Sequence, residues 1–217
     1  MAESKRQFTL GVAMLQPITT PTTEYWSMRN VFWDFTPGTS DRQYIGSEIL
    51  SPMVSIKYQI GVNWDSVRRQ LGVNGGDIMV RLGIIAVADV PLVTVSSSGI
   101  SDVPVEWHIN RNVYRPTWNG NNVTVVKMKT FKFSPVAYYS TSAVIGGGTA
   151  YKSGKLNVRL KGKKQFTQTS GLVNTPLLKG YNYFVVYGVG LPGNPLDLTS
   201  EARPSIVFDQ FVYYKDF

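Results

Sequence analysis

Cysteine is absent from the sequence, and histidine occurs once, as His108. Without thiols the protein has no disulfide bond, no cysteine nucleophile and no zinc site built on cysteine ligands. A single histidine excludes a cluster of histidine metal ligands, and a histidine base would also need an orienting partner and a nucleophile within reach. We therefore predict no catalytic residue, no metal site and no cofactor, and we interpret His108, between Trp107 and Ile109, as a packing residue.

Acidic residues and long apolar runs are also scarce. Lys and Arg number 22 against 14 Asp and Glu, which gives a formal net charge of +8 and favours a polyanionic partner. Apolar runs such as 84–88 and 183–187 are far shorter than the roughly 20 residues that cross a bilayer. The N-terminal segment lacks the apolar core of a secretory signal, so we expect a soluble, intracellular protein that does not insert into membranes.

Helical periodicity is nearly missing, and strand signals take its place. The 12 Tyr, 10 Phe and 5 Trp, with many β-branched residues, suit a pleated, half-buried surface. A short helix is expected at Asp65–Leu71 with Asp65 or Ser66 as its N-cap, and a long loop at Asp89–Asn122. Eight strands are expected, at Gln7–Gln16, Arg29–Phe35, Val54–Val62, Ile78–Ala88, Val123–Phe133, Lys155–Phe166, Tyr181–Val189 and Ile206–Tyr214.

Alternation within these strands predicts how they pack. Leu156 and Val158 point to one face of their strand, and Arg159 and Lys161 point to the other, so one face is buried and the other is wet or faces a partner. The last expected strand is apolar on both faces, which predicts a place inside a sheet or beneath an interface. The pattern predicts an all-β, antiparallel sandwich that comprises residues 1–217 as a single domain.

Two glycine-rich segments resemble nucleotide-binding loops. Residues 188–193 match the spacing of the dinucleotide-binding motif, and residues 146–153 resemble a phosphate-binding loop. Both motifs need a helix whose N-terminus receives the phosphate, and neither segment is followed by a helical pattern. We interpret the first as a strand that ends in a turn and the second as a mobile loop.

Basic residues are better organised than any catalytic pattern. They gather in two segments, one with Lys127, Lys129 and Lys132 and one with Lys152, Lys155, Arg159, Lys161, Lys163 and Lys164. These side chains could contact phosphates without reading a sequence, and a nearby aromatic ring could stack on bases. A solvated strand end that prevents edge-to-edge aggregation explains the same pattern equally well.

Three segments carry a resemblance to a known family. The loop TPGTSDRQYIGSEI at 36–49 has an arginine and an Ile-Gly pair and leads into the strand expected at 54–60. Residues 77–89 look like the strand that follows, and residues 203–217 look like a final strand and terminus. In this order of elements the chain resembles the capsid proteins of circular single-stranded DNA viruses, the circovirus-like group.

The resemblance implies an eight-stranded antiparallel jelly-roll sandwich with long loops, whose copies form a small icosahedral shell around a circular single-stranded DNA genome. It also implies a location in the virion, in the host cell nucleus during assembly, and a host-cell surface receptor as a further partner. Such proteins usually begin with a long Arg-rich arm, and here only Lys5 and Arg6 precede the first expected strand. Either the arm is removed or not represented, or the inner wall of the shell holds the genome.

On this basis a set of basic residues is predicted to bind nucleic acid from the inner surface. A β-sandwich module that binds carbohydrate or another ligand through Trp107, Tyr114 and Trp118 is the alternative, and a hydrolase with a pair of carboxylates is the third hypothesis. The predicted nucleic-acid-binding residues are Lys5, Arg6, Lys127, Lys129, Lys132, Arg159, Lys161, Lys163 and Lys164.

Overall fold

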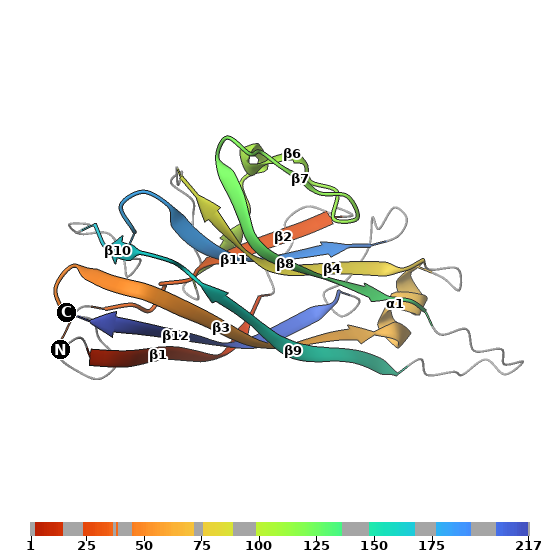
Figure 1. Cartoon of the computed structure of the whole chain (residues 1–217). Coiled ribbons are helices and arrows are strands. Elements are labelled where there is room, and N and C mark those ends of the chain that lie inside the picture. Colours follow the sequence, from red (N-terminus) through yellow and green to blue (C-terminus); the bar gives the residue numbers. More distant parts are fainter. Residues whose placement is uncertain are drawn as a thin grey trace, which may run out of the picture.

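The computed structural model describes residues 3–14, 24–36, 38, 45–71, 76–88, 99–135, 148–167, 177–191 and 203–216. These residues form twelve strands, one α-helix and one short 3₁₀ helix (Figure 1). The elements are β1 (Glu3–Ala13), β2 (Glu24–Asn30), β3 (Glu48–Asn63), α1 (Trp64–Leu71), β4 (Ile78–Val87), β5 (Ile100–Asp102), η1 (Val105–Trp107), β6 (His108–Asn110), β7 (Thr117–Trp118), β8 (Val123–Phe133), β9 (Thr149–Arg159), β10 (Lys163–Gln165), β11 (Asn182–Gly190) and β12 (Ser205–Asp216).

Two antiparallel sheets pack face to face (Figure 1). In the β3 sheet the order is β1, β12, β3, and both β9 and β10 pair along the remaining edge of β3. In the β11 sheet the order is β5, β2, β11, β4, β8. The predicted all-β antiparallel sandwich is confirmed. The predicted number of eight strands is not, because four short strands, β5, β6, β7 and β10, bring the total over the described residues to twelve.

The main hydrophobic core lies between the two sheets. Its side chains come from alternate positions of the long strands, for example Ile56 in β3, Phe208 in β12 and Leu82 in β4, all fully buried. Each such side chain contributes roughly 1.5 to 3 kcal/mol when it leaves water. Leu156 and Val158 of β9 join this core as predicted. β12 lies between β1 and β3, which confirms its expected place inside a sheet.

A second hydrophobic cluster covers the outer face of the β11 sheet. Residues 99–122, which contain β5, η1, β6 and β7 and are here named the cap, cross over this face (Figure 1). Trp26 and Val186 of the sheet are buried there with Trp107 and Val113 of the cap. The expected long loop at Asp89–Asn122 is therefore wrong for its described part, because these residues form short elements that cover a sheet with their own apolar side chains.

Hydrogen bonds attach the cap to the sheet beneath it. The indole N–H of Trp26 donates to the carbonyl of Arg111 at 2.7 Å. The guanidinium of Arg81 donates to the carbonyls of Val113 at 2.6 Å and Tyr114 at 3.1 Å. The hydroxyl of Tyr114 in turn donates to the Asp77 carbonyl at 2.6 Å. The cap thus buries Trp26, Phe184 and Val186 on the outer face of this sheet.

The short helix is confirmed, with a different cap. α1 begins at Trp64, one residue earlier than expected. The side-chain oxygen of Asn63 accepts hydrogen bonds from the backbone N–H groups of Asp65 at 3.1 Å and Ser66 at 3.2 Å. The expected caps Asp65 and Ser66 are therefore wrong. Asn63, the last residue of β3, already satisfies the first free N–H groups of the helix.

Two expected strands are interrupted by turns. The strand expected at Arg29–Phe35 ends at Asn30, because the Asn30 side-chain oxygen accepts the Phe32 N–H at 2.8 Å and starts a turn. The strand expected at Lys155–Phe166 is divided into β9 and β10 by a turn at 160–162. Gly162 has a φ of 79° there, a left-handed conformation that glycine adopts without strain.

The glycine-rich segments also have definite places. Residues 149–153 belong to β9, so the mobile loop expected at 146–153 is wrong for this part, and residues 146–147 lie outside the described part of the chain. Gly188 and Gly190 lie within the last three residues of β11, which ends one residue later than expected, and both pair with β2 and β4. Of the family-like loop at 36–49, residues 37 and 39–44 lie outside the described residues.

Gly188 tests how closely the outer face of β11 is packed. A Cβ atom at this position would lie 2.7 Å from ring carbons of Trp26. We expect Gly188→Ala to lower the free energy of unfolding by about 1 to 3 kcal/mol, the usual cost of overpacking, in urea unfolding followed by tryptophan fluorescence. Gly120→Ala is the control, because no atom lies within 4 Å of its Cβ position. Equal stability of the two variants would contradict this packing.

Candidate nucleic-acid interface

The outer face of the β3 sheet carries basic and aromatic side chains from four strands. Because side chains alternate along a strand, the strand register places them in rows. Arg6, Tyr213, Met53 and Arg159 form one row across β1, β12, β3 and β9. We name this surface the cationic face. Its basic residues are Arg6, Lys57, Lys155, Arg159 and Lys215, and its aromatic residues are Phe8, Tyr151, Phe211 and Tyr213.

Acidic side chains are few among the described residues of this face, and Asp209 already accepts a hydrogen bond. Asp209 lies beside Lys57 in the β12–β3 register, and its carboxylate accepts the backbone N–H of Gly11 at 2.9 Å. Lys57 and Lys155 lie directly opposite one another in the β3–β9 pair. Like charges in that position destabilise a sheet. An anion bound beside the two lysines would relieve this repulsion, so the pair favours an anionic partner outside the chain.

Aromatic rings hold several of these cations in place. The guanidinium of Arg6 lies 5.6 Å from the Phe8 ring centroid and 6.0 Å from that of Phe211. The ammonium of Lys57 lies 5.2 Å from the Phe211 ring. The rings of Phe211 and Tyr213 lie 6.4 Å apart with an interplanar angle of 20°. Half-exposed rings beside positive charges are the combination that binds single-stranded nucleic acid without sequence preference.

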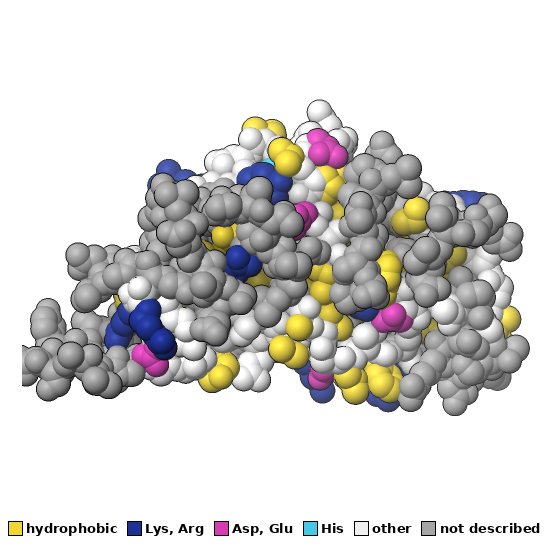
Figure 2. Space-filling view, turned by 180° about the vertical axis from the view of Figure 1, so that it is seen from behind, with side chains coloured by type: hydrophobic (Ala, Val, Ile, Leu, Met, Phe, Trp, Pro, Cys, Tyr) yellow, Lys and Arg dark blue, Asp and Glu magenta, His cyan; other side chains and the backbone are white. Residues whose placement is uncertain are grey.

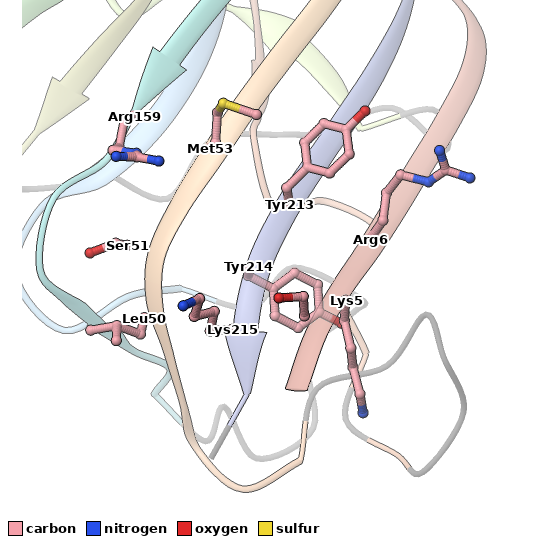
Figure 3. A pocket seen from close by; sticks show the side chains of 10 residues that line it. Lys5, Arg6, Leu50, Ser51, Met53, Arg159, Tyr213, Tyr214 and Lys215 are labelled. Carbon is pink, nitrogen blue, oxygen red and sulfur yellow. The ribbon is translucent and has the colours of Figure 1, made fainter. Parts of the chain in front are cut away.

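One end of the cationic face is hollowed into a depression of about 710 Å³, here named the basin (Figure 3). Four basic side chains and no carboxylate line it. In Figure 3, Arg159 and Lys215 approach β3 from the strands on its two sides, and Tyr213 lies next to Met53. The lining residues are Ser4, Lys5, Arg6, Leu50, Ser51, Met53, Arg159, Tyr213, Tyr214 and Lys215.

Seen from behind in Figure 2, the Lys and Arg side chains that are not grey are scattered and form no large patch of one sign. The cationic face combines basic and aromatic side chains in contact and is our candidate interface among the described residues.

Of the predicted nucleic-acid-binding residues, Arg6 and Arg159 lie on the cationic face in the same row. Lys5 is buried within β1, although its side chain also lines the basin. The expectation that Lys5 and Arg6 precede the first strand is wrong, because β1 begins at Glu3 and pairs with β12 along most of its length.

The three lysines of β8 lie elsewhere, along the seam between the two sheets. Lys127 donates to the Asn157 carbonyl at 3.1 Å, and Lys129 donates to the Lys155 carbonyl at 2.8 Å. Lys132 pairs with Asp77 at 2.7 Å. The bonds of Lys127 and Lys129 occupy carbonyl groups along the edge of β9 that no described strand covers, so these two lysines protect a sheet edge.

The lysines around the turn at 160–162 do not continue the row of Arg159. Lys161 is exposed in the turn itself. Lys163 in β10 pairs with Glu48 at 2.8 Å, and the Lys164 ammonium lies 5.1 Å from the Tyr183 ring. The expected continuous strand through Arg159, Lys161 and Lys163 is wrong because the turn interrupts it. Lys163 nevertheless borders the cationic face, because it opposes Leu50 in the β10–β3 register, as Lys215 does in the β12–β3 register.

Sequence reasoning did not select Lys57, Lys215, Phe211 or Tyr213 for the interface. Each lies at an alternating polar or aromatic position, which could have predicted that its side chain lies on the outer side of its own strand. Their proximity to Arg6 depends on pairing between β1, β3 and β12, which are far apart in the sequence.

The aromatic residues proposed for a carbohydrate site serve the cap instead. Trp107 is fully buried. Tyr114 is half-buried, and its hydroxyl donates to two backbone carbonyls. Trp118 packs edge-on against Trp26 at 5.1 Å and lies 4.0 Å from the His108 ring. No open platform of these rings remains for a sugar to stack on.

The single histidine has a structural environment, and metal-ligand clusters are absent among the described residues. His108 is buried against Trp26 and Trp118, as expected of a packing residue. The described part of the chain holds no group of three or more His, Cys, Asp or Glu residues that could bind a metal ion.

Comparison with known proteins adds no relative: no protein-family model matches the chain, and no curated protein matches it. Across the described residues, no helix has the length and apolar character needed to cross a membrane.

The burial of His108 predicts how the free energy of unfolding depends on pH. Burial, aided by the positive charge of Arg111, lowers its pKa from 6.5 to about 4 in the folded protein. The unfolded chain therefore binds a proton at a higher pH than the folded protein does. The free energy of unfolding should fall by about 2 kcal/mol from about pH 7.5 to about pH 5. His108→Phe should remove this dependence in urea unfolding series, and an equal pH dependence of both proteins would contradict the burial.

Proposed function

We propose that the chain is the coat protein of a small virus, which assembles with copies of itself into a closed icosahedral shell around circular single-stranded DNA. The single observation that carries this proposal is the cationic face, an open sheet surface on which basic and aromatic side chains alternate. A protein that packages a polyanion of any sequence needs phosphate contacts and stacking surfaces rather than base-specific hydrogen bonds.

Strand order supports a jelly roll as the finer description of the sandwich. Apart from the short β5, β6, β7 and β10, one sheet has the order β1, β12, β3, β9 and the other has β2, β11, β4, β8. The two ends of the chain are neighbours in the first sheet, and strands from the two halves alternate in both. Eight strands in two such sheets define the jelly roll, an architecture that viral capsid proteins share with lectins and cupins.

The two outer faces of the sandwich support a division between an inner and an outer wall. The cap closes the face of the β11 sheet, whereas no described segment covers the cationic face of the β3 sheet. In the proposed shell the cationic face lines the interior and contacts the packaged DNA. The cap side then faces outward, where a host-cell receptor would bind.

Exposed apolar side chains supply contact surface for self-assembly. Val105 and Ile109 project from the cap, and Leu10 and Val207 project from the β3 sheet, each with about half or more of its side chain exposed. In the proposed shell these side chains would be buried at contacts between copies of the chain. Contacts between unlike patches close into symmetric shells when the rotation between copies is suitable.

The proposed protein is structural and needs neither a catalytic residue nor a cofactor. Its site of action is the virion, and during assembly the host cell nucleus. A carbohydrate-binding module is the weaker alternative, because the described aromatic residues that it would use are occupied by cap packing.

Assembly is the direct test of this proposal. We expect the purified full-length chain, mixed with circular single-stranded DNA at moderate salt, to form uniform closed particles in electron micrographs and one large species in light scattering. Particle yield should fall as salt rises, because phosphate contacts release counterions. A protein that stays monomeric at high concentration, with and without DNA, would overturn the proposal.

A further inference from the structure

The basin is built around an irregular point in β3. The register of β12 with β3 shifts between Tyr213 and Lys215, so Ser51 and Pro52 oppose a single residue. Ser51 has a φ of 42°, the one non-glycine residue with a positive φ among those described. Such conformations cost of order 1 to 3 kcal/mol and gather at functional sites. Bulges also redirect side chains beside active or binding sites.

Backbone hydrogen bonds join this bulge to the turn between β9 and β10. The Ser51 N–H donates to the Gly162 carbonyl at 2.9 Å, and the Leu160 N–H donates to the Pro52 carbonyl at 2.8 Å. These bonds fix the end of β9, and Arg159 with it, against β3. Backbone hydrogen bonds on both sides of β3 therefore set the positions from which Arg159 and Lys215 approach the basin (Figure 3).

Two of the four basin cations have no carboxylate partner among the described residues. Among the described residues, neither Arg159 nor Lys215 has a carboxylate partner, in contrast to Lys132 and Lys163, which pair with Asp77 and Glu48. Two cations that lie over one strand repel each other unless an anion lies between them. A phosphate group suits this position, because an arginine fork and a lysine point charge both bind phosphate oxygens.

An aromatic surface lies beside this anion position. Tyr213 precedes Lys215 on the same face of β12, and it is next to Met53 and Arg6 in the row that also contains Arg159. Its ring is half-exposed and nearly parallel to that of Phe211. The series of rings continues from Tyr213 along β12, which gives a base next to the phosphate a surface on which to stack.

We propose that the basin is a nucleotide subsite: Arg159 and Lys215 hold one phosphate of a single strand over the β3 bulge, and Tyr213 stacks on the adjacent base. This proposal rests on the proposed function and identifies where on the chain one nucleotide of the packaged strand binds. A sulfated polysaccharide would also satisfy the two cations, but it offers no base for Tyr213. The aromatic ring beside the cations therefore favours nucleic acid.

The first experiment measures the salt dependence of binding. Fluorescent oligothymidylate is titrated with the full-length parent, with Arg159→Gln/Lys215→Gln, and with the control Arg115→Gln/Lys179→Gln, which removes two exposed positive charges outside the basin. Loss of one phosphate contact should reduce the slope of log affinity against log salt by about 0.7 in the basin variant. The control should keep the parental slope, and the swap Arg159→Lys/Lys215→Arg, which preserves charge, should keep most of it.

The second experiment tests the stacking role. Tyr213→Ala should weaken oligothymidylate binding by roughly 5- to 150-fold, the range for loss of one stacked base, with no change in salt slope. Tyr181→Ala, which removes an exposed tyrosine outside the basin, should have no effect. Heparin binding should be insensitive to Tyr213→Ala. Urea unfolding of every variant confirms that each one is folded before binding is compared.

The outcomes separate this proposal from the proposed function. If the parent binds DNA and forms particles while the basin variant behaves like its control, the subsite is wrong and the coat function stands. If the parent neither binds DNA nor assembles, the coat function itself is wrong. If the basin variant loses heparin and oligothymidylate equally while Tyr213→Ala changes neither, the basin is a general anion site and the nucleotide subsite is overturned.

Discussion

Pairing along both edges of β3 is the constraint on which the rest of the structure depends. This 16-residue strand binds β12 on one side and β9 and β10 on the other. Side chains alternate with a period of two, so a slip of one residue would exchange the buried and exposed sets. The register that buries Ile56 and Ile60 in the core is therefore the same register that brings Arg6, Tyr213 and Arg159 into one row outside.

The outer faces of the two sheets differ in what contacts their apolar and aromatic side chains. The β11 sheet is covered by the cap, held by the Trp26 and Arg81 hydrogen bonds to cap carbonyls. The β3 sheet keeps an open face on which rings and cations satisfy one another through cation–π contacts. Lys127 and Lys129 close the seam at the edge of β9. The cationic face is accordingly the surface at which we propose polyanion binding.

Irregular backbone positions gather where the cationic face is most basic. The β3 bulge at Ser51, the left-handed Gly162 and the break between β9 and β10 occur together. The turn ends β9 after Arg159, so Arg159 and Lys215 approach β3 from its two sides, and Lys163 of β10 lies opposite Leu50 beyond the bulge.

Local sequence patterns determined much of this protein. The period-two alternation of β9 predicted that Leu156 and Val158 are buried, and turn residues located most strands and α1, because these preferences act over a few residues. Only the tertiary structure decided which cations meet, since β1 and β12 pair across nearly the whole chain. A sequence shows that Lys129 is basic, but not that the Lys155 carbonyl accepts a hydrogen bond from its ammonium group. Alternation is a local property of the backbone, whereas strand register is fixed by the packing of distant segments.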